Sequence, residues 1–128
     1  MSDQTIFPAL RYRDAPAAIE WLGRALGFEA RMVVDGPNGT VAHAELAYDG
    51  AVIMLGSVRD GDGYAPPPGG AAAYLVVDDP DAHHERARAA GAKIVRDLQD
   101  TDYGSREYSV RDPEGNVWSF GTYRPGAS

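Results

Sequence analysis

The sequence predicts an α+β fold in which two copies of a strand–helix–strand–strand–strand (βαβββ) module follow one another along 128 residues. Three observations support this prediction: similar segments recur at a fixed offset, both copies carry helix start signals at matching places, and turn sequences separate the short apolar runs that follow. We expect residues 1–128 to form a single domain made of two repeats, at about 5–56 and 71–123.

The repeat is visible in two segments that begin with a leucine, at positions 10 and 75. Five pairs of identical residues stand 65 positions apart in them: Leu10 and Leu75, Asp14 and Asp79, Ala17 and Ala82, Glu20 and Glu85, and Ala25 and Ala90. One or two matches could arise by chance, whereas five at one offset indicate a duplicated unit.

Each copy begins with a short apolar strand, at residues 6–12 and 72–77, and continues into a helix. Asp14 and Asp79 are good N-caps, and a proline falls in the first turn of each helix, where its missing N–H costs nothing. Gly27 supplies the stop signal of the first helix.

The two helices differ in the strength of their apolar faces. The first presents Ile19, Leu22 and Leu26 on one face, and Trp21 lies off that line, so we expect Trp21 to be partly exposed. The second has only a thin apolar face, formed by Ala82, Arg86, Ala89 and Ala90. Its adjacent histidines, His83 and His84, point in diverging directions and are expected to be solvent exposed.

Three strands are predicted after each helix. Their ranges are 29–34, 40–47 and 52–56 in the first copy, and 93–98, 107–111 and 117–122 in the second. The sequence YDGA is typical of a two-residue hairpin turn, and RDPEGN is its longer counterpart. The Gly/Pro-rich stretch 57–70 joins the copies, either as a mobile connection or as a flap that carries Tyr64 over a binding site.

The hairpin turn fixes which side chains share a face of the sheet. It places Glu45 opposite Met54 and Leu46 opposite Ile53, and directly opposite residues lie on one face. The faces expected to pack on the helices carry Ala44, Leu46, Ile53 and Leu55 in the first copy, and Tyr108, Val110, Trp118 and Phe120 in the second. The opposite faces mix polar and apolar groups, which suits the wall of a small-molecule cleft between two facing half-sheets.

Composition excludes several classes of function. A net charge of -7 argues against a nucleic-acid partner, which requires a basic surface. The chain has no cysteine, so disulfides, thiolate zinc sites and cysteine nucleophiles are excluded. No apolar run reaches membrane-spanning length and the start does not resemble a signal peptide, so we expect no membrane partner and a cytoplasmic location.

Three stretches resemble the vicinal oxygen chelate superfamily, the glyoxalase/bleomycin-resistance/dioxygenase fold, in its PhnB-like or bleomycin-resistance-like branch. They are ALRYRDAPAAIEWLGRALGF, AYLVVDDPDAHHERARAAGA and EYSVRDPEGNVWSFGTY. The resemblance implies paired βαβββ modules that form a U-shaped, mostly antiparallel mixed sheet around a cleft, with helices on the outer face, commonly in a homodimer.

In metal-dependent members of that superfamily, the first and last strands of each module supply four inward histidine or glutamate ligands. The matching positions here are Phe7, Met54, Ala72 and Ser119. None of these four side chains is a suitable ligand for a hard divalent cation. We therefore expect no metal and no cofactor, and an enzymatic activity is not favoured.

The resulting prediction is metal-independent binding and sequestration of a bulky, partly aromatic small molecule, as in antibiotic resistance. The candidate ligand-binding residues are Phe7, Ala9, His43, Glu45, Met54, Tyr74, Val76, Tyr103, Glu107, Ser109 and Ser119. Arg11 and Arg111 are candidates to pair with the two glutamates.

Two alternatives stay open at the level of sequence. One is a glyoxalase-type lyase or isomerase, or a dioxygenase-like enzyme. It would use a displaced metal site or a general base built from His43, Glu45 and Glu107. The other is a regulatory dimer with a vestigial pocket. A connected cavity favours binding over the regulatory role, and a stoichiometric metal would favour the enzyme.

Overall fold

The computed structural model describes residues 4–61, 63 and 66–126, and it confirms the predicted α+β class. The first module contains, in order, β1 (Ala9–Tyr12), α1 (Ala15–Trp21), the π-helix η1 (Leu22–Leu26), β2 (Glu29–Asp35), the short 3-10 turn η2 (Pro37–Gly39), β3 (Val41–Tyr48) and β4 (Ala51–Ser57). The second contains β5 (Ala72–Val76), α2 (Pro80–Ala89), β6 (Lys93–Asp100), β7 (Arg106–Arg111) and β8 (Val117–Gly121).

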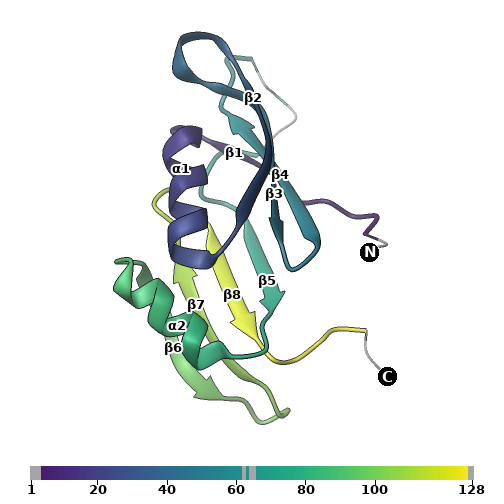
Figure 1. Ribbon diagram of the computed structural model, residues 1–128, viewed down its shortest axis with the longest axis vertical. Helices are drawn as coiled ribbons and strands as arrows, with labels where there is room; N and C mark the ends of the chain where they lie inside the picture. Colours follow the sequence, from purple (N-terminus) through teal and green to yellow (C-terminus); the bar gives the residue numbers. More distant parts are fainter. Residues whose placement is uncertain (1–3, 62, 64–65, 127–128) are drawn as a thin grey trace.

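Each module forms its own four-stranded mixed sheet with the same topology. The strand orders are β1-β4-β3-β2 and β5-β8-β7-β6, and the first strand of each module pairs parallel with the last. Figure 1 shows the two sheets one above the other along the long axis, with α1 and α2 on the same side. The free edge strands are β1 and β2 in one sheet, and β5 and β6 in the other.

The predicted hairpin register is confirmed. Glu45 lies opposite Met54 and Leu46 opposite Ile53, around a turn in which Asp49 and Gly50 both have positive φ, at 48° and 85°. The side chains expected to face the helices are all buried: Ala44, Leu46, Ile53 and Leu55, and Tyr108, Val110, Trp118 and Phe120. Trp118 and Phe120 therefore belong to the core, as predicted.

The helix caps follow the sequence signals. The Asp14 and Asp79 carboxylates accept hydrogen bonds from the amides of Ala17 and Ala82, both at 3.1 Å. Gly27 ends the first helix with a φ of 89°, a left-handed conformation that favours glycine. The expectation for Trp21 was wrong, because its side chain is only 8% exposed. It lies beside the turn that follows α2, a contact between modules that one helix's periodicity does not reveal.

The predicted face of α2 was wrong in part. Ala90 packs against the core as expected, but Ala82, Arg86 and Ala89 are exposed. Ala87 is fully buried instead, and neither histidine is fully exposed. His83 points into the junction between modules, where Nε2 donates to the carbonyl of Leu26 at 2.8 Å and Nδ1 accepts from the Tyr108 hydroxyl. Both ring nitrogens are hydrogen-bonded there, and a buried polar side chain is tolerated when its polar atoms are hydrogen-bonded.

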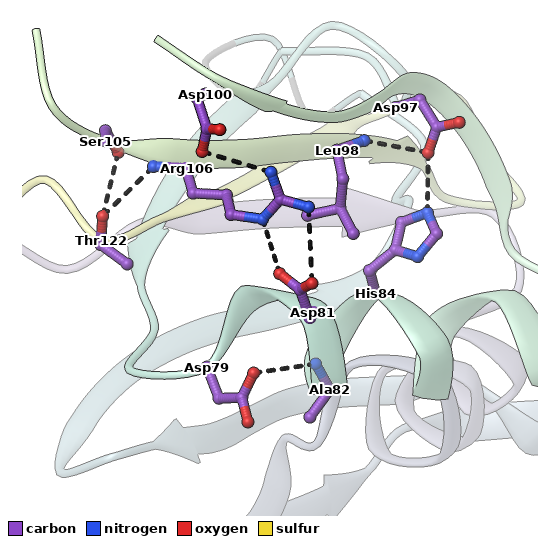
Figure 2. A network of polar contacts seen from close by, with 10 residues as sticks. All are labelled: Asp79, Asp81, Ala82, His84, Asp97, Leu98, Asp100, Ser105, Arg106 and Thr122. Carbon is purple, nitrogen blue, oxygen red and sulfur yellow. Dashed lines mark hydrogen bonds and ion pairs between the residues drawn. The ribbon is translucent and has the colours of Figure 1, made fainter.

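Ion pairs hold the outer side of α2 to the β6–β7 hairpin, as Figure 2 shows. The guanidinium of Arg106 lies between the carboxylates of Asp81, at 2.7 Å, and Asp100, at 3.2 Å. His84 contacts Asp97 at 2.9 Å. These surface contacts fix the helix position, with a small stabilisation each.

A buried carboxylate joins the two modules. Asp112, at the end of β7, accepts hydrogen bonds from the Tyr12 hydroxyl at 2.6 Å and from the Trp118 indole N–H at 3.0 Å. Next to it, the Glu114 carboxylate accepts the backbone amides of Arg13 and Asp14. The end of β1 is thus held by the β7–β8 turn, and both modules share one hydrophobic core.

Within the described residues, neither helix has the length and apolar character needed to cross a membrane.

Candidate functional site

One pocket opens on the face of the second sheet that points away from the helices. Its volume is about 570 Å³, and it is lined by Tyr74, Arg96, Tyr103, Glu107, Ser119, Tyr123 and Pro125. Four of the predicted ligand-binding residues therefore come together: Tyr74 on β5, Tyr103 before β7, Glu107 on β7 and Ser119 on β8. We call this space the tyrosine pocket.

Glu107 is the central polar group of the tyrosine pocket. Its side chain is 5% exposed, and one carboxylate oxygen, Oε1, accepts hydrogen bonds from Arg96 Nη2 and the Tyr103 hydroxyl, each at 2.9 Å. Burial by itself raises the pKa of Glu107, but hydrogen bonds from Arg96, Tyr103 and Ser105 outweigh it and lower the pKa. The carboxylate is therefore ionised at neutral pH, and its charge is balanced by Arg96.

The tyrosines form the walls and rim. The Tyr74 hydroxyl donates to the carbonyl of Tyr123 at 2.6 Å, which holds the segment after β8 against β5. The rings of Tyr103 and Tyr123 meet edge to face, with centroids 5.7 Å apart. Gly121 makes this packing possible, because a Cβ there would stand 2.6 Å from both Glu107 Cγ and the Tyr74 hydroxyl oxygen.

Two serines form the floor beside Glu107. Ser109 and Ser119 lie opposite each other on β7 and β8, and their hydroxyls are hydrogen-bonded at 2.7 Å. Ser119 also lies opposite Tyr74 across the parallel pair of β5 and β8. Ser109 is buried, so of this pair only Ser119 lines the pocket.

The first-module candidates lie on the other sheet. His43 Nε2 and Glu45 Oε2 are 2.8 Å apart on β3, both partly exposed, and Met54 is the partner of Glu45 on β4. Ala9 lies opposite Met54, whereas Phe7 precedes β1 and is exposed. None of these five residues lines the tyrosine pocket.

A smaller pocket of about 270 Å³ lies where the modules meet. Tyr74 and Val76 of β5 contribute to it, together with Phe28, Tyr48 and Val52 of the first module. Val76, the remaining predicted residue, therefore lies at the junction and not in the tyrosine pocket.

The side chains at the expected metal positions do not fit a metal ion. Met54 and Ser119 lie opposite Ala9 and Tyr74, and Ala72 lies opposite Val117. The phenyl ring of Phe7, the thioether of Met54, the methyl group of Ala72 and the hydroxyl of Ser119 do not form the donor set of a hard divalent cation. In the part of the chain that the structure describes, no group of three or more His, Cys, Asp or Glu side chains is placed to hold an ion.

Sequence reasoning missed Arg96 and Tyr123. Arg111, which was a candidate partner of Glu107, instead donates to the carbonyl of Gly115 at 2.9 Å. A signal for Arg96 existed, since a buried carboxylate needs a cation and the predicted strand 93–98 directly precedes the predicted strand 107–111. Tyr64, the residue of the possible flap, lies outside the described residues.

Comparisons with known proteins agree with this architecture. The sequence profile of the Glyoxalase/Bleomycin resistance protein/Dioxygenase superfamily matches residues 5–120. An uncharacterized protein of Mycobacterium bovis is 33% identical over 126 residues, which cover 93% of this chain and 83% of that protein.

Two solved structures are also similar. TioX from Micromonospora sp. ML1 is 34% identical with a TM-score of 0.79, over 94% of this chain and 99% of that one. A glyoxalase/bleomycin resistance protein from Streptomyces sp. CB03234 is 23% identical with a TM-score of 0.70, over 91% and 98%, and this likeness concerns the fold.

Proposed function

The chain belongs to the Glyoxalase/Bleomycin resistance protein/Dioxygenase superfamily, and we propose that it binds and sequesters a bulky, partly aromatic small molecule without a metal ion. A role of this kind is antibiotic-resistance-like: the protein holds a compound and does not convert it.

The tyrosine pocket carries the proposal. Three tyrosines supply aromatic surface, and Glu107, Arg96 and Ser119 supply a few fixed polar groups. Small-molecule sites combine apolar walls with a small number of orienting polar groups in this way, and a volume of about 570 Å³ is in their usual range. The charge pair at the centre is internally balanced, so binding leaves no buried charge unpaired.

We also propose that the protein acts as a homodimer. Met32, Val33 and Val34 on the edge strand β2 are exposed on both faces of the strand. Exposed apolar strand edges favour association. The tyrosine pocket is open to solvent, so a second copy of the chain could cover it.

Isothermal titration with bleomycin and other aromatic natural products tests the function. We expect Ser119→Phe, which fills the tyrosine pocket, to abolish binding, and Val95→Phe, on an exposed position outside the pocket, to leave it unchanged. Thermal unfolding of both variants controls for folding. Equal binding by wild type and Ser119→Phe, or no binding of any aromatic compound, contradicts the proposal.

One observation favours a second candidate, a lyase or isomerase that works by general base catalysis. Glu45 orients the His43 imidazole through the 2.8 Å contact, which leaves Nδ1 available to accept a proton. Turnover of 2-oxoaldehyde hemithioacetals that is lost in His43→Asn and insensitive to EDTA would favour this candidate over sequestration.

A further inference from the structure

We propose that Tyr103 is a built-in occupant of the tyrosine pocket and that the subsite at Glu107 selects ligands through a phenolic hydroxyl. The inference rests on the proposed binding function and names the chemical class of the ligand. A ligand phenol would replace the Tyr103 phenol on the Glu107 carboxylate.

The position of Tyr103 is unusual for an exposed residue. It lies in the short segment between β6 and β7, and 58% of it is exposed to solvent. Its hydroxyl nevertheless reaches the Glu107 carboxylate, whose side chain is 5% exposed. The pocket is thus already complementary to one phenol, and that phenol is supplied by the chain itself.

Charge explains why a neutral O–H donor fits best. Arg96 holds Glu107 Oε1 at 2.9 Å, so a ligand ammonium would have to stand beside a guanidinium that already neutralises the carboxylate. A ligand carboxylate would face the Glu107 charge directly. A phenol brings no charge, and its O–H donates to an ionised acceptor, which is among the stronger hydrogen bonds in proteins.

The surroundings of the subsite suit an aromatic ring. Tyr123 contacts the Tyr103 ring edge to face, and Tyr74 lines the same pocket. A ligand ring that replaced Tyr103 would take over these aromatic contacts. Its hydroxyl would remain protonated at neutral pH, since the hydrogen bond to Glu107 raises the pKa of the Tyr103 phenol and would act on a ligand phenol in the same way.

The segment that carries Tyr103 is held at its base, so the ring can leave Glu107 without opening the segment. Thr101 and Ser105 close it at its base, through backbone and hydroxyl hydrogen bonds between 2.8 and 3.1 Å. Beyond this base, Tyr103 touches the rest of the protein through Glu107 and Tyr123. Release of the hydroxyl therefore frees the ring while the base stays closed.

A pair of matched probes tests the proposal. Fluorescence titration compares 2-naphthol with 2-methoxynaphthalene, which has the same ring system but cannot donate a hydrogen bond. Four proteins are compared: wild type, Tyr103→Phe, Tyr48→Phe and Glu107→Gln. Tyr48→Phe is the matched control, because it removes a tyrosine hydroxyl from a residue that does not line the tyrosine pocket.

We expect wild type to bind 2-naphthol more tightly than 2-methoxynaphthalene. Removal of the competing bond in Tyr103→Phe should tighten 2-naphthol binding by about threefold to tenfold. Tyr48→Phe should bind like wild type, and Glu107→Gln should lose the preference for the phenol while it keeps its unfolding temperature within a few degrees of wild type.

The outcomes separate the two proposals. Equal affinity for both probes in wild type, or unchanged or weaker 2-naphthol binding in Tyr103→Phe, overturns the phenol subsite and leaves the binding function standing. Failure of both probes to bind any of the four proteins, together with failure of the natural-product titrations, overturns the binding function itself.

Discussion

The hydrogen bond from Tyr12 to Asp112 should stabilise the whole protein, because it joins the two modules inside the shared core. Tyr12 is fully buried and its hydroxyl lies 2.6 Å from Asp112 Oδ2. Burial and the neighbouring Asp112 carboxylate raise the pKa of Tyr12, so the phenol is a donor at neutral pH.

Tyr12→Phe removes the hydroxyl and nothing else. Net contributions of hydrogen bonds to charged groups are about 1.5–3 kcal/mol. In this variant the Asp112 carboxylate still accepts hydrogen bonds from the Trp118 indole and the Asn116 amide, so its buried charge keeps partners. We therefore expect a loss of about 2 kcal/mol in the free energy of unfolding. For a domain of this size the unfolding temperature should fall by about 6–8 °C.

Urea and thermal unfolding measure this loss, with Tyr123→Phe as the exposed control that should change the free energy by less than about 0.5 kcal/mol. A double-mutant cycle with Asp112→Asn isolates the pair, and its coupling energy should be about 1 kcal/mol or more. If Tyr12→Phe unfolds like wild type, or if the two substitutions are additive, the bond does not join the modules energetically.

Three further predictions concern pH, packing and metal. Burial lowers the pKa of His83 in the folded state, so the free energy of unfolding should fall as the pH drops below about 6.5. Urea titrations between pH 7.5 and 5.5 should show this loss in wild type, and His83→Gln should lack this part of the slope. Gly121→Ala should cost about 1–3 kcal/mol and weaken ligand binding, because its Cβ would overlap Glu107 and Tyr74. Calorimetry of Gly63→Ala, where a Cβ meets nothing within 4 Å, should match wild type. EDTA or added zinc should shift the unfolding temperature by no more than about 1 °C, and a stabilisation of several degrees by zinc would contradict the donor-set argument.

The elements of the fold could be predicted because their signals are local. Caps at Asp14 and Asp79 and the turn at Asp49 and Gly50 depend on a few neighbouring residues, and they place the strands and their faces. Side chains that meet across the modules could not be predicted this way. The positions of Trp21 and His83 depend on partners far away in the sequence.

The candidate site could be predicted only in part, because its residues come from several strands. Alternation along β7 and β8 identified Glu107 and Ser119, but it did not identify Arg96 on β6. The pairing of β6 with β7 shifts register on both sides of Arg96, between Ile94 and Arg96 and between Arg96 and Gln99. Irregular pairing of this kind breaks simple alternation, so the partner of a residue on a bulged strand has to be seen in the structure.

The β7–β8 turn has a consequence for engineering the chain. Besides the hydrogen bonds to the end of β1, the side-chain oxygen of Asn116 accepts the amides of Gly69 and Ala71, so residues 112–116 hold two distant segments at once. A tag, a fluorophore or new chain termini introduced there would break these hydrogen bonds and destabilise the fold, although the sequence of this turn resembles that of an ordinary connector. Gly63 is exposed, and a Cβ there meets nothing within 4 Å, so it is the better site for an inserted label.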